Sequence, residues 1–262
     1  MMTWLRRVAV VFLMAGVLLG ATQAKAQGTA PKKDYTKDPM QLLIDCLEKQ
    51  KTVIGNTATV TKRERIDGTL REAETMFIKC RCEPLAVYFK WVKNPKKDRE
   101  ALYCQGKYDN KVLGHQPLGP INIEAKMDPN SKDALKESLR PITQASFRTG
   151  LELLVKLTSH AKAAGDLNLF CIENDTYNGR PAYCLLRKLP KKPEYPYFFT
   201  YIYVDKEWMV PTHVAFFDSR DNLLCSYSYA DVKLNVPLTD ADFDKDNPSY
   251  NWPAFIFQKI KL

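Results

Sequence analysis

The stretch VDKEWMVPTHVAFFD, from Val204 to Asp218, predicts the end of one strand, a corner at Pro211 and a second strand. Alternation divides the second strand into two faces, Thr212, Val214 and Phe216 on one and His213, Ala215 and Phe217 on the other. The run just before it, FFTYIYV at 198–204, carries large apolar side chains on both faces. We therefore expect one face to meet packed helices and the other to line an apolar hollow.

The first 26 residues have the pattern of a secretory signal peptide. Arg6 and Arg7 precede an apolar run from Val8 to Leu19, and Ala24-Lys25-Ala26 fits the motif before a cleavage site. The apolar run is shorter than the ~20 residues of a membrane-spanning helix. The sequence thus predicts cleavage near Ala26, a periplasmic or secreted protein, and a polar tether over residues 27–38.

The charge of the chain is moderately basic. It has 262 residues, 39 of them basic and 30 acidic, for a formal net charge of +9. Without the three basic residues of the leader, the charge is +6. Because the basic residues are dispersed, a solvated surface explains them better than a nucleic-acid site, and we expect no nucleic-acid partner.

Most of the chain predicts hairpin-linked strands. Asp67-Gly68 is a strong signal for a tight turn. Strands are expected at 58–66, 70–82, 85–92, 101–105 and 121–125, and then at 170–173, 183–188, 198–204, 212–218 and 223–232. Short connections of this kind favour an antiparallel sheet.

Three helices are expected, one before the strands and two between their two groups. Asp38-Pro39 begins the first, which ends near Lys51. The others are expected at 131–139 and at 143–164, where Gly165 is a good C-cap. The order predicts an α+β fold: a curled antiparallel sheet, or half-open β-barrel, with helices packed over its concave face. The domain is expected to span 39–246, followed by a C-terminal tail at 247–262.

No motif has the spacing of a catalytic or metal site. His115, His160 and His213 are isolated from one another, and the chain has no nucleophile elbow and no phosphate-binding glycine loop. Cys80-Arg81-Cys82 is not a redox Cys-x-x-Cys motif. The four aspartates at 240, 242, 244 and 246 lack the glycine and glutamate of a calcium loop. We expect no metal, no cofactor and no enzymatic activity.

The chain has seven cysteines, an odd number, so at least one is free or pairs between chains. In an oxidising compartment some of them can pair. Cys171 and Cys184 flank the turn-like stretch NDTYNGRP and are the candidate for a disulfide across a hairpin.

Two longer segments resemble the LolA/LolB-like superfamily. They are ETMFIKCRCEPLAVYFKW with the following REALYCQGKYDNKVLGH, and YVDKEWMVPTHVAFFDSRDNLLCSYSYADVKLNVPLTDADFD. Within that superfamily, the chain is most similar to a bacterial family named only as a domain of unknown function. The likeness extends from about Pro39 to Asp244.

The resemblance implies a half-open barrel closed by a helical lid, whose apolar hollow accepts acyl chains of lipids or lipoproteins. In the superfamily's carrier an arginine before a proline holds the lid shut, and the matching residue is Arg81. Two residues, Cys82 and Glu83, separate it from Pro84. Some relatives instead sense such ligands in the cell envelope.

The function expected is therefore that of an exported, non-enzymatic binding protein, a carrier or chaperone for lipid or for the acyl chain of a lipoprotein. Its ligand-binding residues are predicted to be Phe89, Trp91, Leu151, Leu154, Tyr201, Tyr203, Tyr227 and Tyr229. One alternative is an envelope sensor or interaction module that binds a membrane protein partner through the same fold. Another is an enzyme based on the thiols of Cys80 or Cys82.

Overall fold

The computed structural model describes residues 33–93, 96–118 and 121–252. The predicted signal peptide, half of the tether and the last ten residues of the predicted tail lie outside these ranges. Among the described residues, no helix has the length and hydropathy needed to cross a membrane.

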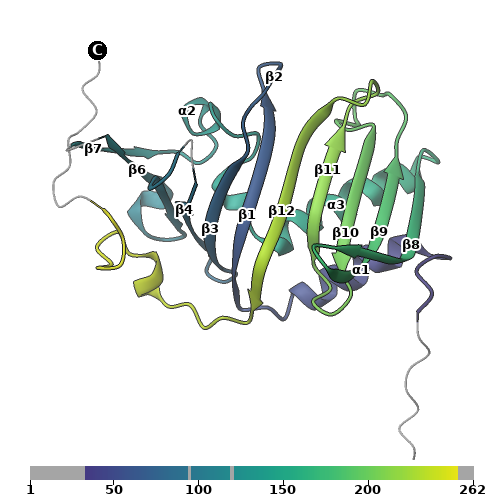
Figure 1. The fold of residues 1–262 in the computed structure, drawn as a ribbon, viewed down its shortest axis with the longest axis horizontal. Coiled ribbons are helices and arrows are strands. Elements are labelled where there is room, and N and C mark those ends of the chain that lie inside the picture. Colours follow the sequence, from purple (N-terminus) through teal and green to yellow (C-terminus); the bar gives the residue numbers. More distant parts are fainter. Residues whose placement is uncertain (1–32, 94–95, 119–120, 253–262) are drawn as a thin grey trace, which may run out of the picture. The chain divides into compact units, whose positions relative to one another are not determined.

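One antiparallel sheet of twelve strands forms the framework (Figure 1). Its order is β7-β6-β5-β4-β3-β1-β12-β11-β10-β9-β8, and β2 pairs with β1 beside this path. The strands are β1 Gly55–Ile66, β2 Thr69–Leu70, β3 Glu74–Arg81, β4 Ala86–Trp91, β5 Glu100–Cys104, β6 Val112–Leu118, β7 Ile121–Met127, β8 Asn168–Tyr177, β9 Arg180–Lys188, β10 Phe199–Asp205, β11 Pro211–Phe217 and β12 Leu223–Leu234.

Strand β1 joins two meanders, β3 to β7 and β8 to β12, because it pairs with β3 on one side and β12 on the other. The predicted turn at Asp67-Gly68 is confirmed, with φ of 48° and 77° at these two residues, as a tight hairpin turn requires. The edge strands β7 and β8 do not pair with each other in the part of the sheet that the structure describes, so the sheet is open. This confirms the predicted curled antiparallel sheet.

Two of the predicted helices are confirmed with adjusted ends. Helix α1 is Pro39–Gln50 and helix α3 is Phe147–Ala163, with Gly165 at φ 73° just after it. The start of α3 lies later than predicted because Ser146 is its N-cap, and the Ser146 hydroxyl accepts a hydrogen bond from the Thr149 amide at 3.0 Å.

The remaining helices are short. The helix predicted at 131–139 shrinks to one turn, α2 Lys132–Leu135. Three 3₁₀ turns are η1 Tyr108–Asn110, η2 Ile142–Gln144 and η3 Asp240–Phe243. Strand β6 was not among the predicted strands, because Gly114, His115 and Pro117 interrupt its apolar alternation.

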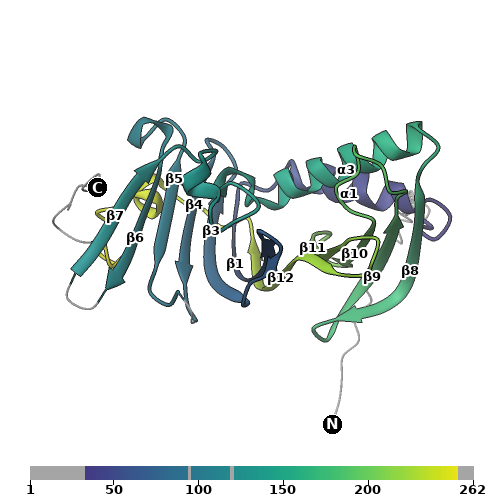
Figure 2. The ribbon, with the colours of Figure 1, turned by 90° about the horizontal axis from the view of Figure 1, so that it is seen from above.

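The connection from β7 to β8 determines which face of the sheet is covered. Since these strands are the two edges of the sheet, the chain between them must cross a whole face. It does so through α2, η2 and α3, and α3 lies on the same side of the sheet as α1 (Figure 2). We call this the inner face, and residues 129–146, between β7 and α3, the cover segment.

The inner face of β8 to β12 packs against α1 and α3 to form the largest apolar cluster. It includes Leu43 and Cys46 of α1, Leu151 of α3, and Leu185 and Ile202 of the sheet, all without exposed surface. Burial of this apolar surface anchors both helices over one half of the sheet.

The outer face is covered over β4 to β6 by the segment after β12. Tyr250 stacks on Tyr88 with ring centroids 4.0 Å apart, and Phe243 is fully buried in the same cluster. Trp252 also packs there. The folded part therefore continues at least to Trp252, beyond the predicted domain end at Asp246.

The predicted Cys171–Cys184 disulfide is wrong. All seven cysteines are free in the structure. Cys171 lies opposite Leu185, whereas Cys184 lies opposite Ile172. Because residues directly opposite each other share a face and successive residues alternate, the two sulfurs lie on opposite faces of the hairpin and cannot meet.

Candidate functional site: a covered apolar cavity

A cavity of about 930 Å³ lies between the inner face and the connection from β7 to β8. Its walls come from β1 and β3 to β7, from β9, β11 and β12, from the cover segment and from α3. Most of the lining side chains are aliphatic or aromatic. This volume is in the upper part of the range of volumes of pockets that bind drug-sized ligands.

Six of the eight predicted ligand-binding residues line this cavity. They are Phe89, Trp91, Leu151, Leu154, Tyr227 and Tyr229. Phe89 and Trp91 share one face of β4 and meet edge to face, with centroids 6.1 Å apart. Phe147 of α3 lies over Tyr229 at 4.8 Å, so an aromatic contact joins the helix to the sheet at the cavity wall.

The other two, Tyr201 and Tyr203, lie on the outer face and do not line the cavity. The inner face of β10 is formed by Thr200, Ile202 and Val204, which are buried against the helices. Tyr201 is instead 38% exposed. Both faces of β10 are indeed apolar, but the second face carries half-exposed aromatic rings rather than the lining of a hollow.

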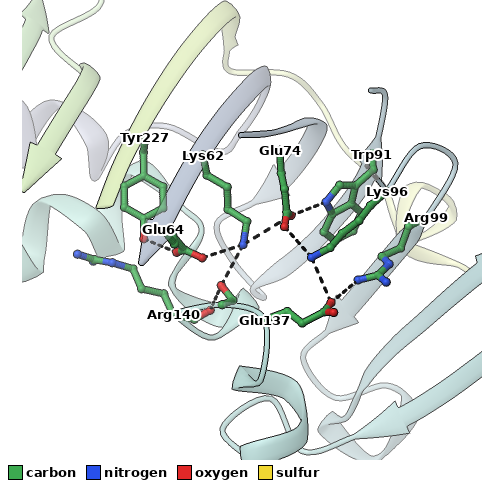
Figure 3. A network of polar contacts seen from close by, with 10 residues as sticks. Lys62, Glu64, Glu74, Trp91, Lys96, Arg99, Glu137, Arg140 and Tyr227 are labelled. Atoms are coloured by element: carbon green, nitrogen blue, oxygen red, sulfur yellow. Dashed lines mark hydrogen bonds and ion pairs between the residues drawn. The ribbon is translucent and has the colours of Figure 1, made fainter. Parts of the chain in front are cut away.

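A polar network joins the sheet to the cover segment at the rim of the cavity (Figure 3). Its centre is Glu74, which accepts hydrogen bonds from Trp91 Nε1 at 2.8 Å and Lys96 Nζ at 2.6 Å. Lys96 also contacts Glu137 of the cover segment at 3.1 Å, and Arg99 contacts the same carboxylate at 2.6 Å. Two cations of the β4–β5 connection thus hold one acid of the cover.

The network continues along β1. Lys62 Nζ donates to Glu64 Oε2 at 2.9 Å and to Ser138 Oγ of the cover segment at 3.3 Å. The hydroxyl of Tyr227 donates to Glu64 Oε1 at 2.6 Å. Tyr227 therefore joins the apolar wall of the cavity to its polar rim.

Electrostatics favour the ionised acids of this network. Burial acts to raise the pKa of Glu74, but the charge of Lys62 and the hydrogen bonds from Lys96 and Trp91 outweigh it, so the pKa lies below its ordinary value. Burial likewise acts to raise the pKa of Glu137, while Arg99 and Lys96 lower it to about 2. Both acids are thus charged at neutral pH and attract the lysines around them.

Arg81, the predicted lid-holding residue, makes its described contacts elsewhere. It donates to the carbonyl of Pro84 at 3.1 Å and pairs with Asp240 of η3 at 2.6 Å. The contact between this turn and the helices is made by Glu83, which pairs with Arg148 of α3 at 2.5 Å. These contacts do not support the expectation that Arg81 holds the helices over the sheet. In this turn it is Glu83 that contacts α3.

Three cavity-lining arginines were not predicted from the sequence: Arg99 of the polar network, Arg140 of the cover segment and Arg187 of β9. Arg187 has no exposed surface, although arginine is rarely buried without a partner. A signal was present: alternation from Tyr183 and Leu185 places Arg187 on the apolar face of its strand.

The thiols next to the cavity show no sign of activation. Burial raises the pKa of the Cys80 thiol well above its ordinary value, which opposes formation of the reactive thiolate. Within the described ranges, no three side chains from His, Cys, Asp and Glu are grouped to hold a metal ion.

Known structures are similar to this chain at low sequence identity. The structure of MucB matches with a TM-score of 0.50 and 13% identity, over 79% of this chain and 62% of that chain. The lipoprotein LppX of Mycobacterium tuberculosis matches with a TM-score of 0.47 and 13% identity, over 77% and 98% of the two chains. The LolA superfamily protein NE2245 of Nitrosomonas europaea matches with a TM-score of 0.34 and 10% identity, over 79% and 97%.

At 13% identity, the match to MucB shows a shared fold and no more than that. A comparison with curated proteins found no match. One family model matches residues 53–252, from just before β1 to the end of the segment that packs on the outer face. This match spans most of the chain, which therefore belongs to the family described as protein of unknown function DUF1571.

Proposed function

We propose that the protein binds an apolar ligand, a lipid or the acyl chain of a lipoprotein, in the cavity on the inner face, and acts as a carrier or chaperone without enzymatic activity. The observation that carries the proposal is the cavity of about 930 Å³ with predominantly apolar walls beneath a crossing connection. A filled sandwich core would leave no such space, because protein interiors pack to the density of organic crystals.

The walls suit a ligand that is recognised by shape. Each methylene group that moves from water into the cavity contributes about 0.8 kcal/mol. An acyl chain thus reaches substantial affinity through contacts with Phe89, Trp91, Leu151 and Tyr229 alone. Such binding needs no polar contact along the chain.

Entry of the ligand requires the cover segment to move. The polar network at Glu74 and Glu137 lies at the rim and joins the cover to the sheet. The ion pairs that reach the cover segment end on Glu137, which is half exposed, and exposed ion pairs each contribute only about 0.2–1 kcal/mol. Such contacts can close the cavity and still open. We infer that the cover segment and the first turns of α3 open together.

The proposed location is the periplasm or the exterior of the cell. It rests on the leader pattern of residues 1–26, which lie outside the described part of the structure. Non-enzymatic action is supported by the raised pKa of the Cys80 thiol, which opposes formation of a reactive thiolate.

The experiment that tests the proposal is native mass spectrometry of the mature protein purified from bacterial periplasm, with lipid extraction of the same sample. A stoichiometric lipid or acyl species that dissociates on activation is the expected result, and its mass identifies the class of cargo. A mass equal to that of the chain alone, unchanged after incubation with lipids, would overturn the proposal.

A further inference from the structure

Arg187 is a buried cation whose hydrogen-bond partners are neutral. It has no exposed surface, and its Nη1 and Nη2 donate to the hydroxyls of Thr158 at 2.9 Å and Thr200 at 3.1 Å. Its Nε has no partner in the described part of the chain. Burial lowers the pKa of Arg187 to about 10, so the guanidinium remains charged at neutral pH. A buried charge without a counter-charge is strongly unfavourable.

Arg140 of the cover segment lines the same cavity. Its Nη2 is 3.5 Å from the hydroxyl of Tyr197, and its guanidinium is 5.5 Å from the ring centroids of both Phe216 and Tyr227. The ring of Tyr197 packs on Phe216 at 4.2 Å, and the hydroxyl of Tyr197 also interacts electrostatically with Arg187. Both arginines line the cavity, and they meet at Tyr197.

Three of the acids that line the cavity have cations of their own. Glu64 pairs with Lys62 at 2.9 Å, and Glu137 pairs with Arg99 at 2.6 Å. Glu100 pairs with Lys90 at 3.6 Å. No ion pair joins Arg140 or Arg187 to an acid among the described residues, and the chain has no acidic side chain outside them.

The register of the sheet gives the distance from Arg187 to Glu64, the acid reached by following directly opposite residues from strand to strand. Arg187 is opposite Thr200, which is opposite Phe216, then Cys225 and then Glu64. These four strand spacings amount to about 19 Å along the sheet. Glu64 is therefore too distant to neutralise Arg187.

We propose that the cavity binds a long-chain carboxylic acid, with its carboxylate between Arg140 and Arg187 and its alkyl chain along the inner face toward Phe89 and Trp91. This inference rests on the proposed function and names its ligand class. A guanidinium binds a carboxylate through parallel N–H donors, and the charge of the ligand supplies the counter-ion that the side chains do not. From β9 to β4 there are six strand spacings, about 29 Å, which suits a long chain.

The test measures the affinity of the mature protein for palmitic acid and for its uncharged methyl ester by isothermal titration calorimetry. We expect the acid to bind at least tenfold more tightly than the ester. The substitutions Arg140→Gln and Arg187→Met should each weaken binding of the acid about tenfold and leave binding of the ester unchanged. Arg220→Gln is the matched control, because its side chain is 84% exposed in a distant turn.

The outcomes separate the two proposals. Equal affinities for acid and ester in the wild type would overturn the carboxylate site while leaving the apolar cavity as the binding site. No binding of either compound would overturn the proposed function as well. Displacement of palmitate by millimolar inorganic phosphate would identify a small-anion site and also overturn the assignment. Thermal unfolding of each variant checks the fold, and Arg140→Gln tests the site if Arg187→Met does not fold.

Discussion

Glu137 of the cover segment and Arg99 of the β4–β5 connection form an ion pair in which Oε2 and Nη1 are 2.6 Å apart. Lys96 contacts the same carboxylate at 3.1 Å, so one acid of the cover holds two cations next to the sheet. Glu137 is on the polar rim of the cavity rather than on its apolar wall. Its replacement therefore weakens the attachment of the cover segment to the sheet without removing apolar contacts.

The first prediction concerns closure. Glu137→Gln should increase hydrogen exchange of the amides in residues 129–140 several-fold and speed ligand dissociation, because the charge that attracts Arg99 and Lys96 is lost. The free energy of unfolding should fall by about 1 kcal/mol or less, since the side chain is half exposed. Exchange measured by mass spectrometry and dissociation measured by stopped flow give the two readouts.

The control for this variant is Glu48→Gln. Glu48 forms an exposed pair with Lys51 at 2.7 Å on α1, away from the cavity rim. If both variants changed exchange of the cover segment equally, the ion pairs of Glu137 would not be what holds it.

The second prediction is the pH dependence of the same group. The pKa of Glu137 is about 2, below its ordinary 4.5: burial acts to raise it, but hydrogen bonds from Arg99 and Lys96 outweigh that effect. A depressed pKa in the folded state contributes stability that is complete above about pH 4.5 and is lost as the pH falls toward 2. Urea unfolding should show a difference between wild type and Glu137→Gln that shrinks across this window, and a constant difference would contradict the assignment.

The third prediction fills the cavity. Gly150 lies on α3 and lines the cavity, and a Cβ added there meets no heavy atom within 4 Å. Gly150→Leu should stabilise the protein, because glycine inside a helix costs about 1 kcal/mol relative to good helix formers. It should also lower ligand affinity at least tenfold, because the side chain occupies the space of the ligand.

Gly150→Ala is the matched variant for this position. It should give a similar rise in the thermal unfolding temperature with affinity close to wild type, since a methyl group takes little volume. Wild-type affinity in Gly150→Leu would show that the ligand binds outside the cavity.

The fourth prediction separates the two faces of the sheet. Phe89→Ala should lower the affinity for an apolar ligand about tenfold or more, since burial of one phenylalanine side chain is worth about 1.5–3 kcal/mol. Tyr201→Ser should leave the affinity within twofold of wild type, because Tyr201 is on the outer face and 38% exposed. Titration with palmitate or its methyl ester measures both, and equal losses would place the ligand elsewhere.

The fifth prediction concerns Cys171, which is free and packs at the edge of the main apolar cluster. Cys171→Ser should change the free energy of unfolding by about 1 kcal/mol, whereas loss of a native disulfide typically costs about 2–5 kcal/mol. Non-reducing peptide mapping of the wild type should find no linked pair with Cys184. A linked pair would contradict the register of β8 and β9.

Much of the architecture was predictable because its signals are local. Turn residues such as Asp67-Gly68, the Asp38-Pro39 helix start and strand alternation locate most elements within a few residues. Alternation also shows which residues share a face, such as Phe89 with Trp91 and Tyr201 with Tyr203. It does not show which face meets the helices, and for β10, where both faces are apolar, the prediction chose the wrong one.

The sequence by itself thus determined the two meanders apart from β6, their main turns and the apolar stripes, because each depends on neighbours a few residues away. Only the tertiary structure decided what the stripes face. The chain between β7 and β8 must cross the sheet because these strands form opposite edges, and that pairing depends on contacts far apart in the sequence. The same crossing covers the cavity, brings Glu137 to Arg99 and places Arg140 at the cavity wall that Arg187 also lines, since long-range packing alone sets those positions.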